Sequence, residues 1–276
     1  MAIFISFVAL LGYIYGEATG YGLSYAGIAL IFSGFVSFGS YYFGDKLVLS
    51  MSHARPADPT RDFDFYTVSE NLCIAAGIPK PKLYVIEDTA LNAFATGRDP
   101  EHAVVVATSG LLSTLERAEL EGVIAHELSH VKNYDIRLMS IVAVLVGTIA
   151  FLADMFMRSM WRGGDRKKGG GVFILLGVFF AILSPIMATL IQLALSRRRE
   201  YLADASAAML TRHPEGLARA LEKIAGDKEV LEAASNATAH LYISNPFKDK
   251  QYSAWFAGLF NTHPPIAERI KILRSV

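Results

Sequence analysis

The stretch Glu116–Asp135, ERAELEGVIAHELSHVKNYD, decides how the centre of this chain folds. Its apolar residues recur at the spacing of one helical face, which predicts a helix: Leu120, Ile124, Leu128 and Val131. Inside it, His126-Glu-Leu-Ser-His130 is the pattern H-E-x-x-H. Residues four apart share a helical face, so both imidazoles can bind one metal ion. Glu127 lies beside them, where it can act as general base on a metal-bound water.

A catalytic zinc needs a third protein ligand and one open position. The segment Ser196–Asp204, SRRREYLAD, offers Glu200 and Asp204, which are four residues apart and share a helical face. One carboxylate can bind the metal while the other accepts a hydrogen bond from a ligating imidazole. Taken alone, the two acids would be an ordinary exposed pair beside three arginines. Beside H-E-x-x-H they become candidate site residues.

The composition shows that part of the chain leaves water. Of 276 residues, 53% are hydrophobic and only 19% are charged, against about 25% charged in a typical soluble domain. The 26 basic and 26 acidic residues give no net charge, which argues against a nucleic-acid partner. Cys73 is the only cysteine, so the chain has no internal disulfide. A closed structural zinc site needs a fourth protein ligand, typically Cys or His, and with a single thiol in the chain an open site is preferred.

Four uncharged runs account for the apolar surplus. Met1–Gly16 and Ala18–Gly44 are separated only by Glu17, which predicts a helical hairpin in the membrane. Leu138–Ala153 and Val172–Leu195 follow later and enclose a basic, glycine-rich loop. The alternative for this second pair is two buried core helices.

These runs divide the chain into four parts. We expect an N-terminal transmembrane hairpin at 1–45, a first catalytic part at 46–135, a second hydrophobic hairpin with a basic loop at 136–196, and a second catalytic part at 197–276. The strand-like stretches Leu83–Glu87 and Ala103–Ala107 predict a small β-sheet within a mainly α membrane protein. Asp135, just after the motif helix, is expected to orient that helix or cap its end.

One metal ion with ligands from both catalytic parts constrains the topology. Both parts must lie on the same side of the membrane, so the second pair crosses twice or not at all. Lys46, Arg55 and Arg61 follow the first hairpin and predict a cytoplasmic catalytic site. The five basic residues of the loop Arg158–Lys168 oppose a crossing pair, yet the long uncharged run before Leu195 favours it. Partial embedding remains the alternative.

Together these features resemble the HtpX-type membrane zinc metalloproteases, relatives of the CAAX prenyl protease. The resemblance covers nearly the whole chain in the expected order. It is carried by the two hydrophobic pairs and by four motifs: Asn92-Ala-Phe-Ala-Thr-Gly97, His126-Glu-Leu-Ser-His130, Arg199-Glu-Tyr-x-Ala-Asp204, and Thr262-His-Pro-Pro265 followed by Arg269. It implies a gluzincin-type zinc metalloprotease domain.

The resemblance also implies roles for individual residues. One Zn²⁺ per chain would be bound by His126, His130 and Glu200, with Glu127 as the base that activates the zinc-bound water. Asp204 would stand behind the ligands. Two further residues would lie near the reaction centre and stabilise the developing oxyanion, His263 and Arg269. An edge strand would hold the substrate in extended form through backbone bonds, although a surface loop is an equal alternative: Asn92, Ala93, Phe94 and Ala95.

By resemblance, the protein would be a multi-pass endopeptidase of the cytoplasmic (inner) membrane. Its substrates would be misfolded or damaged membrane proteins, cut at their cytoplasmic parts during stress, with overlap with other membrane quality-control proteases. The lipid bilayer would be its other partner. The alternatives are a CAAX-type or other processing protease and a non-catalytic zinc-stabilised membrane scaffold. An intramembrane protease is disfavoured because charged residues flank the motif.

Overall fold

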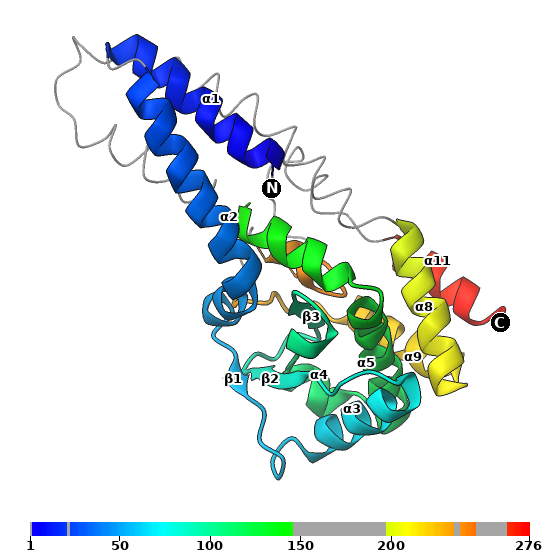
Figure 1. Ribbon diagram of the computed structural model, residues 1–276. Coiled ribbons are helices and arrows are strands. Elements are labelled where there is room, and N and C mark those ends of the chain that lie inside the picture. The colour runs from blue at the N-terminus through cyan, green and yellow to red at the C-terminus, as the bar shows by residue number, and fades with distance from the viewer. Residues whose placement is uncertain (1, 21–22, 146–196, 235–237, 247–263) are drawn as a thin grey trace.

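The computed structural model describes residues 2–20, 23–145, 197–234, 238–246 and 264–276. Two long helices, α1 (Ala2–Thr19) and α2 (Leu23–Met51), project from a part built of one small sheet and several helices (Figure 1). The predicted fold class, mainly helical with a small sheet, is confirmed at this level. α2 continues to Met51, past the boundary expected at residue 45.

The sheet has four strands in the order β1-β2-β4-β3. They span Arg55–Pro56 (β1), Lys82–Ile86 (β2), Ala93–Gly97 (β3) and Ala103–Thr108 (β4). β2 and β4 pair in parallel, while β1 and β3 add antiparallel at the two edges. The predicted strands at 83–87 and 103–107 are therefore both present, each within one residue of the expected bounds. β3 forms the edge next to the motif helix.

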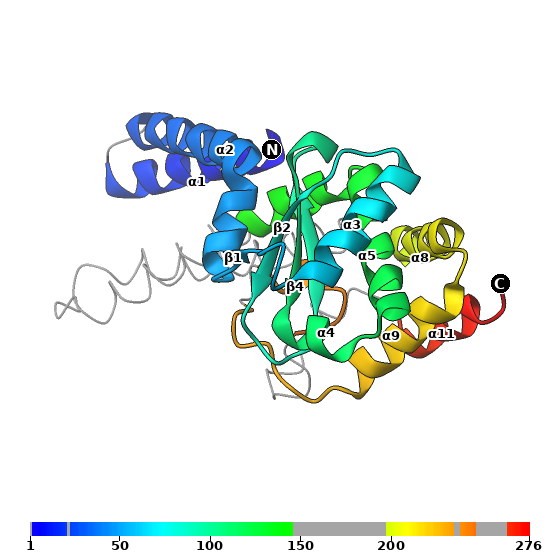
Figure 2. The same ribbon diagram turned by 90° about the horizontal axis from the view of Figure 1, so that it is seen from below.

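Helices cover one face of this sheet (Figure 2). The motif helix is α5 (Arg117–Lys132), which begins with a capping box between Glu116 and Glu119. The helix expected over Glu116–Asp135 is shorter in the structure: α5 ends at Lys132, and a separate helical stretch covers residues 135–145. The other helices are α3 (Phe63–Ala76), α4 (Ser109–Thr114), α8 (Arg197–Thr211), α9 (Pro214–Gly226) and α11 (Ile266–Leu273), with short 3₁₀ turns η1 (Pro100–His102) and η2 (Ala239–Leu241).

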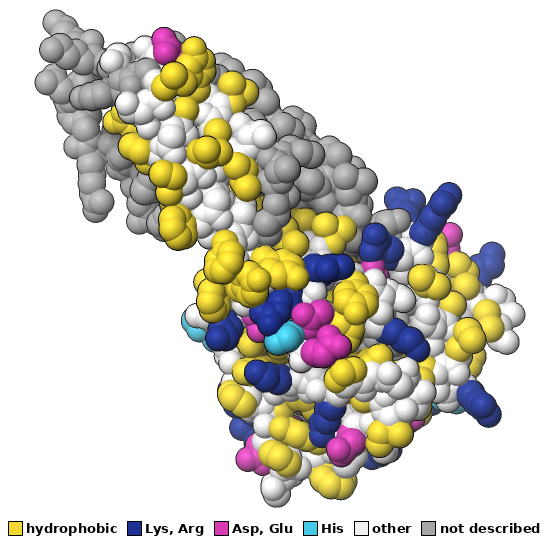
Figure 3. All heavy atoms as spheres, viewed as in Figure 1, with side chains coloured by type: hydrophobic (Ala, Val, Ile, Leu, Met, Phe, Trp, Pro, Cys, Tyr) yellow, Lys and Arg dark blue, Asp and Glu magenta, His cyan; other side chains and the backbone are white. Residues whose placement is uncertain are grey.

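The outer surface of α2 is apolar, with large side chains such as Phe35 and Phe38 exposed (Figure 3). Among the described residues, α2 alone is long and apolar enough to cross a membrane by length and composition. α1 packs along α2, and a Cβ on Gly12 would lie 2.5 Å from the Ala29 Cβ. Most of the predicted second hydrophobic pair, including its basic loop, lies outside the described residues.

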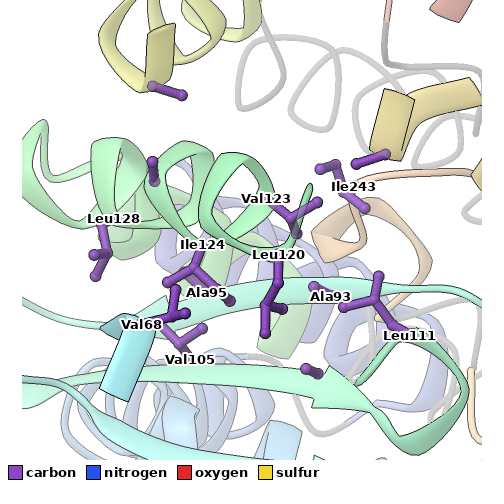
Figure 4. Packing of buried hydrophobic residues seen from close by; sticks show 14 of the residues in the cluster. Val68, Ala93, Ala95, Val105, Leu111, Leu120, Val123, Ile124, Leu128 and Ile243 are labelled. Carbon is purple, nitrogen blue, oxygen red and sulfur yellow. The ribbon is translucent and has the colours of Figure 1, made fainter. Parts of the chain in front are cut away.

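Two hydrophobic clusters lie on opposite faces of the sheet, and β4 contributes to both in alternation. On one face, Ala103, Val105 and Ala107 of β4 pack with residues of α3, α5, α8 and α9 (Figure 4). Val104 and Val106 face the other cluster, where the end of α2, residues 135–145 and Tyr242 meet. The motif helix is thus fixed by a core on the sheet, while the second cluster joins that sheet to the end of α2 and to the helical stretch 135–145.

Candidate metal centre

Three side chains from two helices converge beside the sheet. His126 and His130 lie on α5, and Glu200 lies in the first turn of α8. The Nε2 atoms of His126 and His130 are 3.2 Å apart. The carboxylate oxygens of Glu200 lie 3.7 Å from His126 Nε2 and 3.5 Å from His130 Nε2. All three side chains are buried, and their donor atoms lie within 4.8 Å of one another. The structure therefore brings together the three residues that the sequence singled out as metal ligands.

The spacing of these donors suits a tetrahedral zinc ion. Zinc binds imidazole nitrogen and carboxylate oxygen at about 2.0–2.2 Å, which places tetrahedral donors about 3.3 Å apart. The three separations of 3.2, 3.5 and 3.7 Å lie close to that value. Two imidazoles and one carboxylate also match the donor sets of catalytic zinc sites, which leave a fourth position open. The group of His126, His130 and Glu200 is thus a possible metal site.

Asp204 and Arg269 stand behind His126. The Nδ1 of His126 lies 2.9 Å from Asp204 Oδ1, so its N–H donates to the carboxylate and Nε2 is left toward the metal position. Arg269 donates to both Asp204 oxygens, at 2.8 Å from Nε and 2.7 Å from Nη2. Its side chain is fully buried, and its Nη2 is 3.4 Å from His126 Nδ1. Arg269 therefore holds Asp204, the carboxylate that contacts the candidate ligand His126.

His130 has a corresponding carboxylate contact that sequence reasoning missed. Its Nδ1 lies 3.1 Å from Asp135 Oδ2, and Asp135 Oδ1 accepts a hydrogen bond from Arg199. Asp135 had been expected only to orient the helix or cap its end. The sequence offers only a weak signal for this turn: Asn133 ends α5 as its C-cap, but Tyr134 is not a residue that favours the left-handed conformation it adopts.

Glu127 is buried between the ligands and β3. Burial raises its pKa to about 7, assisted by the negative charge of Glu200 and opposed by His130 and Arg269. The backbone amide of Ala95 also acts on this carboxylate and lowers its pKa. A carboxyl group whose pKa lies near neutrality can both accept and release a proton at physiological pH.

The buried charges around the site favour a cation. Four carboxylates meet here, from Glu127, Asp135, Glu200 and Asp204, against the two guanidinium groups of Arg199 and Arg269. Burial lowers the pKa of His126. For His130, burial is outweighed by Asp135 and by the charges of Glu200 and Glu127, which raise its pKa to about 9. A bound metal would displace that proton and neutralise the excess negative charge.

The expected substrate strand forms the sheet edge, but another part of the chain covers it. The Ala93 carbonyl accepts a hydrogen bond from Ile243 N–H at 3.0 Å, and Nδ2 of the Asn92 side chain donates to the Ser244 carbonyl at 3.1 Å. The Phe94 ring packs edge-on against Tyr242, with centroids 4.9 Å apart. All five β3 residues are buried. His263, the other residue expected near the reaction centre, lies outside the described residues.

The fold and this site define a metallopeptidase: a small mixed sheet, an H-E-x-x-H helix beside its edge, and a glutamate from a second helix. The chain belongs to peptidase family M48, whose model matches residues 59–276. It is 48% identical over 244 residues to a Protease HtpX homolog of Caldanaerobacter subterraneus subsp. tengcongensis, covering 86% of this chain and 80% of that protein. A Protease HtpX homolog of Dictyoglomus turgidum is 50% identical over 252 residues, covering 90% and 81%.

A solved structure shares the fold. The crystal structure of Ste24p from S. mikatae matches with a TM-score of 0.52 at 19% identity, covering 96% of this chain and 62% of that one. The family and its relatives confirm the resemblance to HtpX-type proteases, and the protein is a membrane-associated metalloendopeptidase. A CAAX-type processing enzyme and a non-catalytic scaffold are not favoured by these relatives.

Proposed function

We propose that the protein is a zinc-dependent endopeptidase that cuts misfolded or damaged membrane proteins at their cytoplasmic parts, as part of quality control under stress. The observation that carries the proposal is the convergence of His126, His130 and Glu200 beside the buried Glu127. The donor spacing and the excess of buried carboxylates support one zinc ion per chain. Two histidines and one carboxylate suit zinc among the common metals.

Glu127 would act as general base and then general acid. Bound zinc supplies Lewis-acid activation of water and of the peptide carbonyl. The Glu127 carboxylate accepts the proton of the attacking water and returns it to the leaving amine nitrogen. Its burial supports this shuttle, because a pKa near 7 matches both halves of the proton transfer. Asp204 holds His126 in the orientation that directs Nε2 toward the metal.

An extended peptide would add to the edge of β3. The Ala93 carbonyl and the Ala95 amide point away from β4, toward the side where Glu127 and Ile243 lie. Backbone pairing there would hold many different sequences, which suits a protease for unfolded substrates. Asn92 and Phe94 would flank this binding strand. The substrate would take the hydrogen-bonding position that Ile243 occupies on Ala93.

Two residues were expected to stabilise the oxyanion, His263 and Arg269, and the contacts of Arg269 bear on its role. The Nε and Nη2 of Arg269 donate to Asp204, and its Nη1 lies 3.8 Å from Glu200 Oε2. These contacts support a positioning role for Arg269, acting through Asp204 and Glu200. Donation to the oxyanion is therefore proposed for His263.

The membrane part would hold this site at the cytoplasmic face of the inner membrane. α2 contacts β3 directly, and the helical stretch 135–145 follows the motif helix after two residues. A site so close to the membrane-side helices would meet loops and ends of other membrane proteins. We propose a multi-pass topology with a crossing second pair. Labelling a cysteine introduced at Ser159 from outside intact cells tests it, and absence of labelling contradicts the crossing.

The proteolytic mechanism is tested with the full chain in detergent and added zinc. Cleavage of casein and self-cleavage are compared for the wild type, Glu127→Gln and Glu121→Gln. Glu121 lies on the same helix and its side chain is 38% exposed, so it is a matched control. We expect Glu127→Gln to bind zinc but lose cleavage, and Glu121→Gln to cleave normally. Equal cleavage by the wild type and Glu127→Gln would contradict the proposed role of Glu127 as general base.

A further inference from the structure

The metal centre contains a carboxylate contact that lies outside its sequence motifs. His130 Nδ1 is 3.1 Å from Asp135 Oδ2, and both side chains are buried. We propose that Asp135 is a positioning residue for His130, and that Arg199 fixes Asp135 in turn. The inference rests on the metal-dependent function proposed above and names two further residues on which that function depends.

The backbone turns Asp135 toward His130. If α5 continued, residue 135 would lie about 140° around the helix from His130, out of reach of its ring. Instead α5 ends at Lys132, and Tyr134 adopts a left-handed conformation with φ of 60°. A bulky residue in this region is an outlier that persists only where the surroundings impose it. The break returns the chain so that Asp135 faces the imidazole one turn back.

Both oxygens of Asp135 are used in side-chain contacts. Oδ2 accepts from His130, and Oδ1 accepts from Arg199. A helix-capping role would require a bond from the carboxylate to a backbone amide, and the hydrogen bonds found for this side chain go to the imidazole and the guanidinium instead. The contacts favour orientation of a ligand over capping.

Arg199 ties this contact to the third ligand. It precedes Glu200 on α8, so consecutive residues of one helical turn reach Asp135 and the metal position. The two histidines are thereby supported in the same way. Asp204 with Arg269 stands behind His126, and Asp135 with Arg199 stands behind His130. Each Nδ1–H is held by a carboxylate, and each Nε2 is left for the metal.

Loss of such a contact weakens metal binding typically tenfold to hundredfold. We therefore expect Asp135→Ala to weaken Zn²⁺ binding by about that factor. Asp135→Asn should have a smaller effect, because its amide oxygen can still accept from Nδ1–H. Arg199→Ala should also weaken binding, and Arg199→Lys should restore part of the loss because it keeps the charge without the guanidinium fork.

The test uses the full-length protein in detergent, stripped of metal and titrated with Zn²⁺ against a fluorescent zinc indicator. Arg198→Ala is the matched control, because Arg198 is an exposed neighbour on the same helix. Its Zn²⁺ affinity should equal that of the wild type. Co²⁺ absorption gives a second readout, since a reoriented His130 changes the ligand field while a loss of stability alone does not.

Thermal unfolding of the metal-free variants shows whether they fold. If the Asp135 variants do not fold, Arg199→Ala decides, because its side chain is 41% exposed and less central to packing. Wild-type Zn²⁺ affinity in folded Asp135→Ala and Arg199→Ala would overturn this inference while leaving the protease intact. A wild-type protein that binds zinc but cleaves nothing would contradict the proposed function alone.

Discussion

Arg269 and Asp204 form a two-point ion pair that solvent does not reach. The guanidinium Nε and Nη2 donate to the two carboxylate oxygens at 2.8 and 2.7 Å, and Asp204 Oδ1 also lies 2.9 Å from His126 Nδ1. The Arg269 hydrogen bonds and His126 outweigh the effect of burial and lower the pKa of Asp204 to about 2, so the carboxylate stays charged. A residue near the C-terminus thereby fixes a ligand of the motif helix.

Removing this pair should weaken both metal binding and stability. Arg269→Ala leaves the Asp204 charge buried without its partner, which costs about 3–5 kcal/mol in comparable pairs. Asp204→Ala should weaken Zn²⁺ binding about tenfold to hundredfold, because the imidazole loses the acceptor of its Nδ1–H. Zinc titration and thermal unfolding measure the two effects. Arg274→Ala is the control, since its exposed ion pairs with Glu215 and Glu222 should contribute little.

The close crossing of α5 and α9 should not tolerate a side chain at Gly122. A Cβ there would lie 2.6 Å from the Leu217 backbone nitrogen and 2.7 Å from its Cα. We expect Gly122→Ala to lower the free energy of unfolding by about 1–3 kcal/mol. Gly226→Ala, with open space around its Cβ position, should be neutral or stabilising. Thermal unfolding in detergent compares them, and equal melting temperatures would refute the tight crossing.

Ser140 connects β3 to the helical stretch after the motif helix. Its hydroxyl lies 2.8 Å from Thr96 Oγ1 and accepts from the Gly97 amide at 3.0 Å. Ser140→Ala should leave these buried donors unpaired and destabilise the protein by about 1–3 kcal/mol. Ser206→Ala on α8 is the comparison, because its exposed hydroxyl donates to the Leu202 carbonyl of its own helix. A similar loss in both variants would argue against the buried network.

Stability should fall in acid partly through Asp62. Burial raises its pKa, but hydrogen bonds from Arg55 and the Asp58 amide outweigh burial and bring the pKa below its usual value. A carboxyl group with a lowered folded-state pKa stabilises the fold above its unfolded pKa of about 3.9, and that contribution is lost as pH falls through the folded value. Asp62→Asn should therefore show a flatter acid dependence of unfolding. Denaturant titrations across this range measure it, and an unchanged slope would contradict the assignment.

Local patterns in the sequence were enough to find the three candidate ligands that the structure brings together. His126 and His130 share a helical face by spacing alone, and Glu200 with Asp204 repeats that logic on α8. Contacts between distant segments were beyond such patterns. Arg269 meets Asp204 across 65 positions, and Ser244 meets Asn92 across 152, so neither pairing has a local signature. The contact between Asp135 and His130 depends on the left-handed turn at Tyr134, which an amphipathic pattern does not encode.

The ion pair between Asp135 and Arg199 has a further consequence for how such chains can be altered. Along the sequence, Asp135 is the last of the site residues before the segment 146–196, and Arg199 is the first one after it. Their ion pair therefore joins the two ends of the chain that meet at the metal site. We therefore expect that a change in the length of the chain between Asp135 and Arg199 leaves their contact, and the ligands beside them, in place. A variant in which a short linker replaces part of that segment is expected to keep the positions of His130 and Glu200.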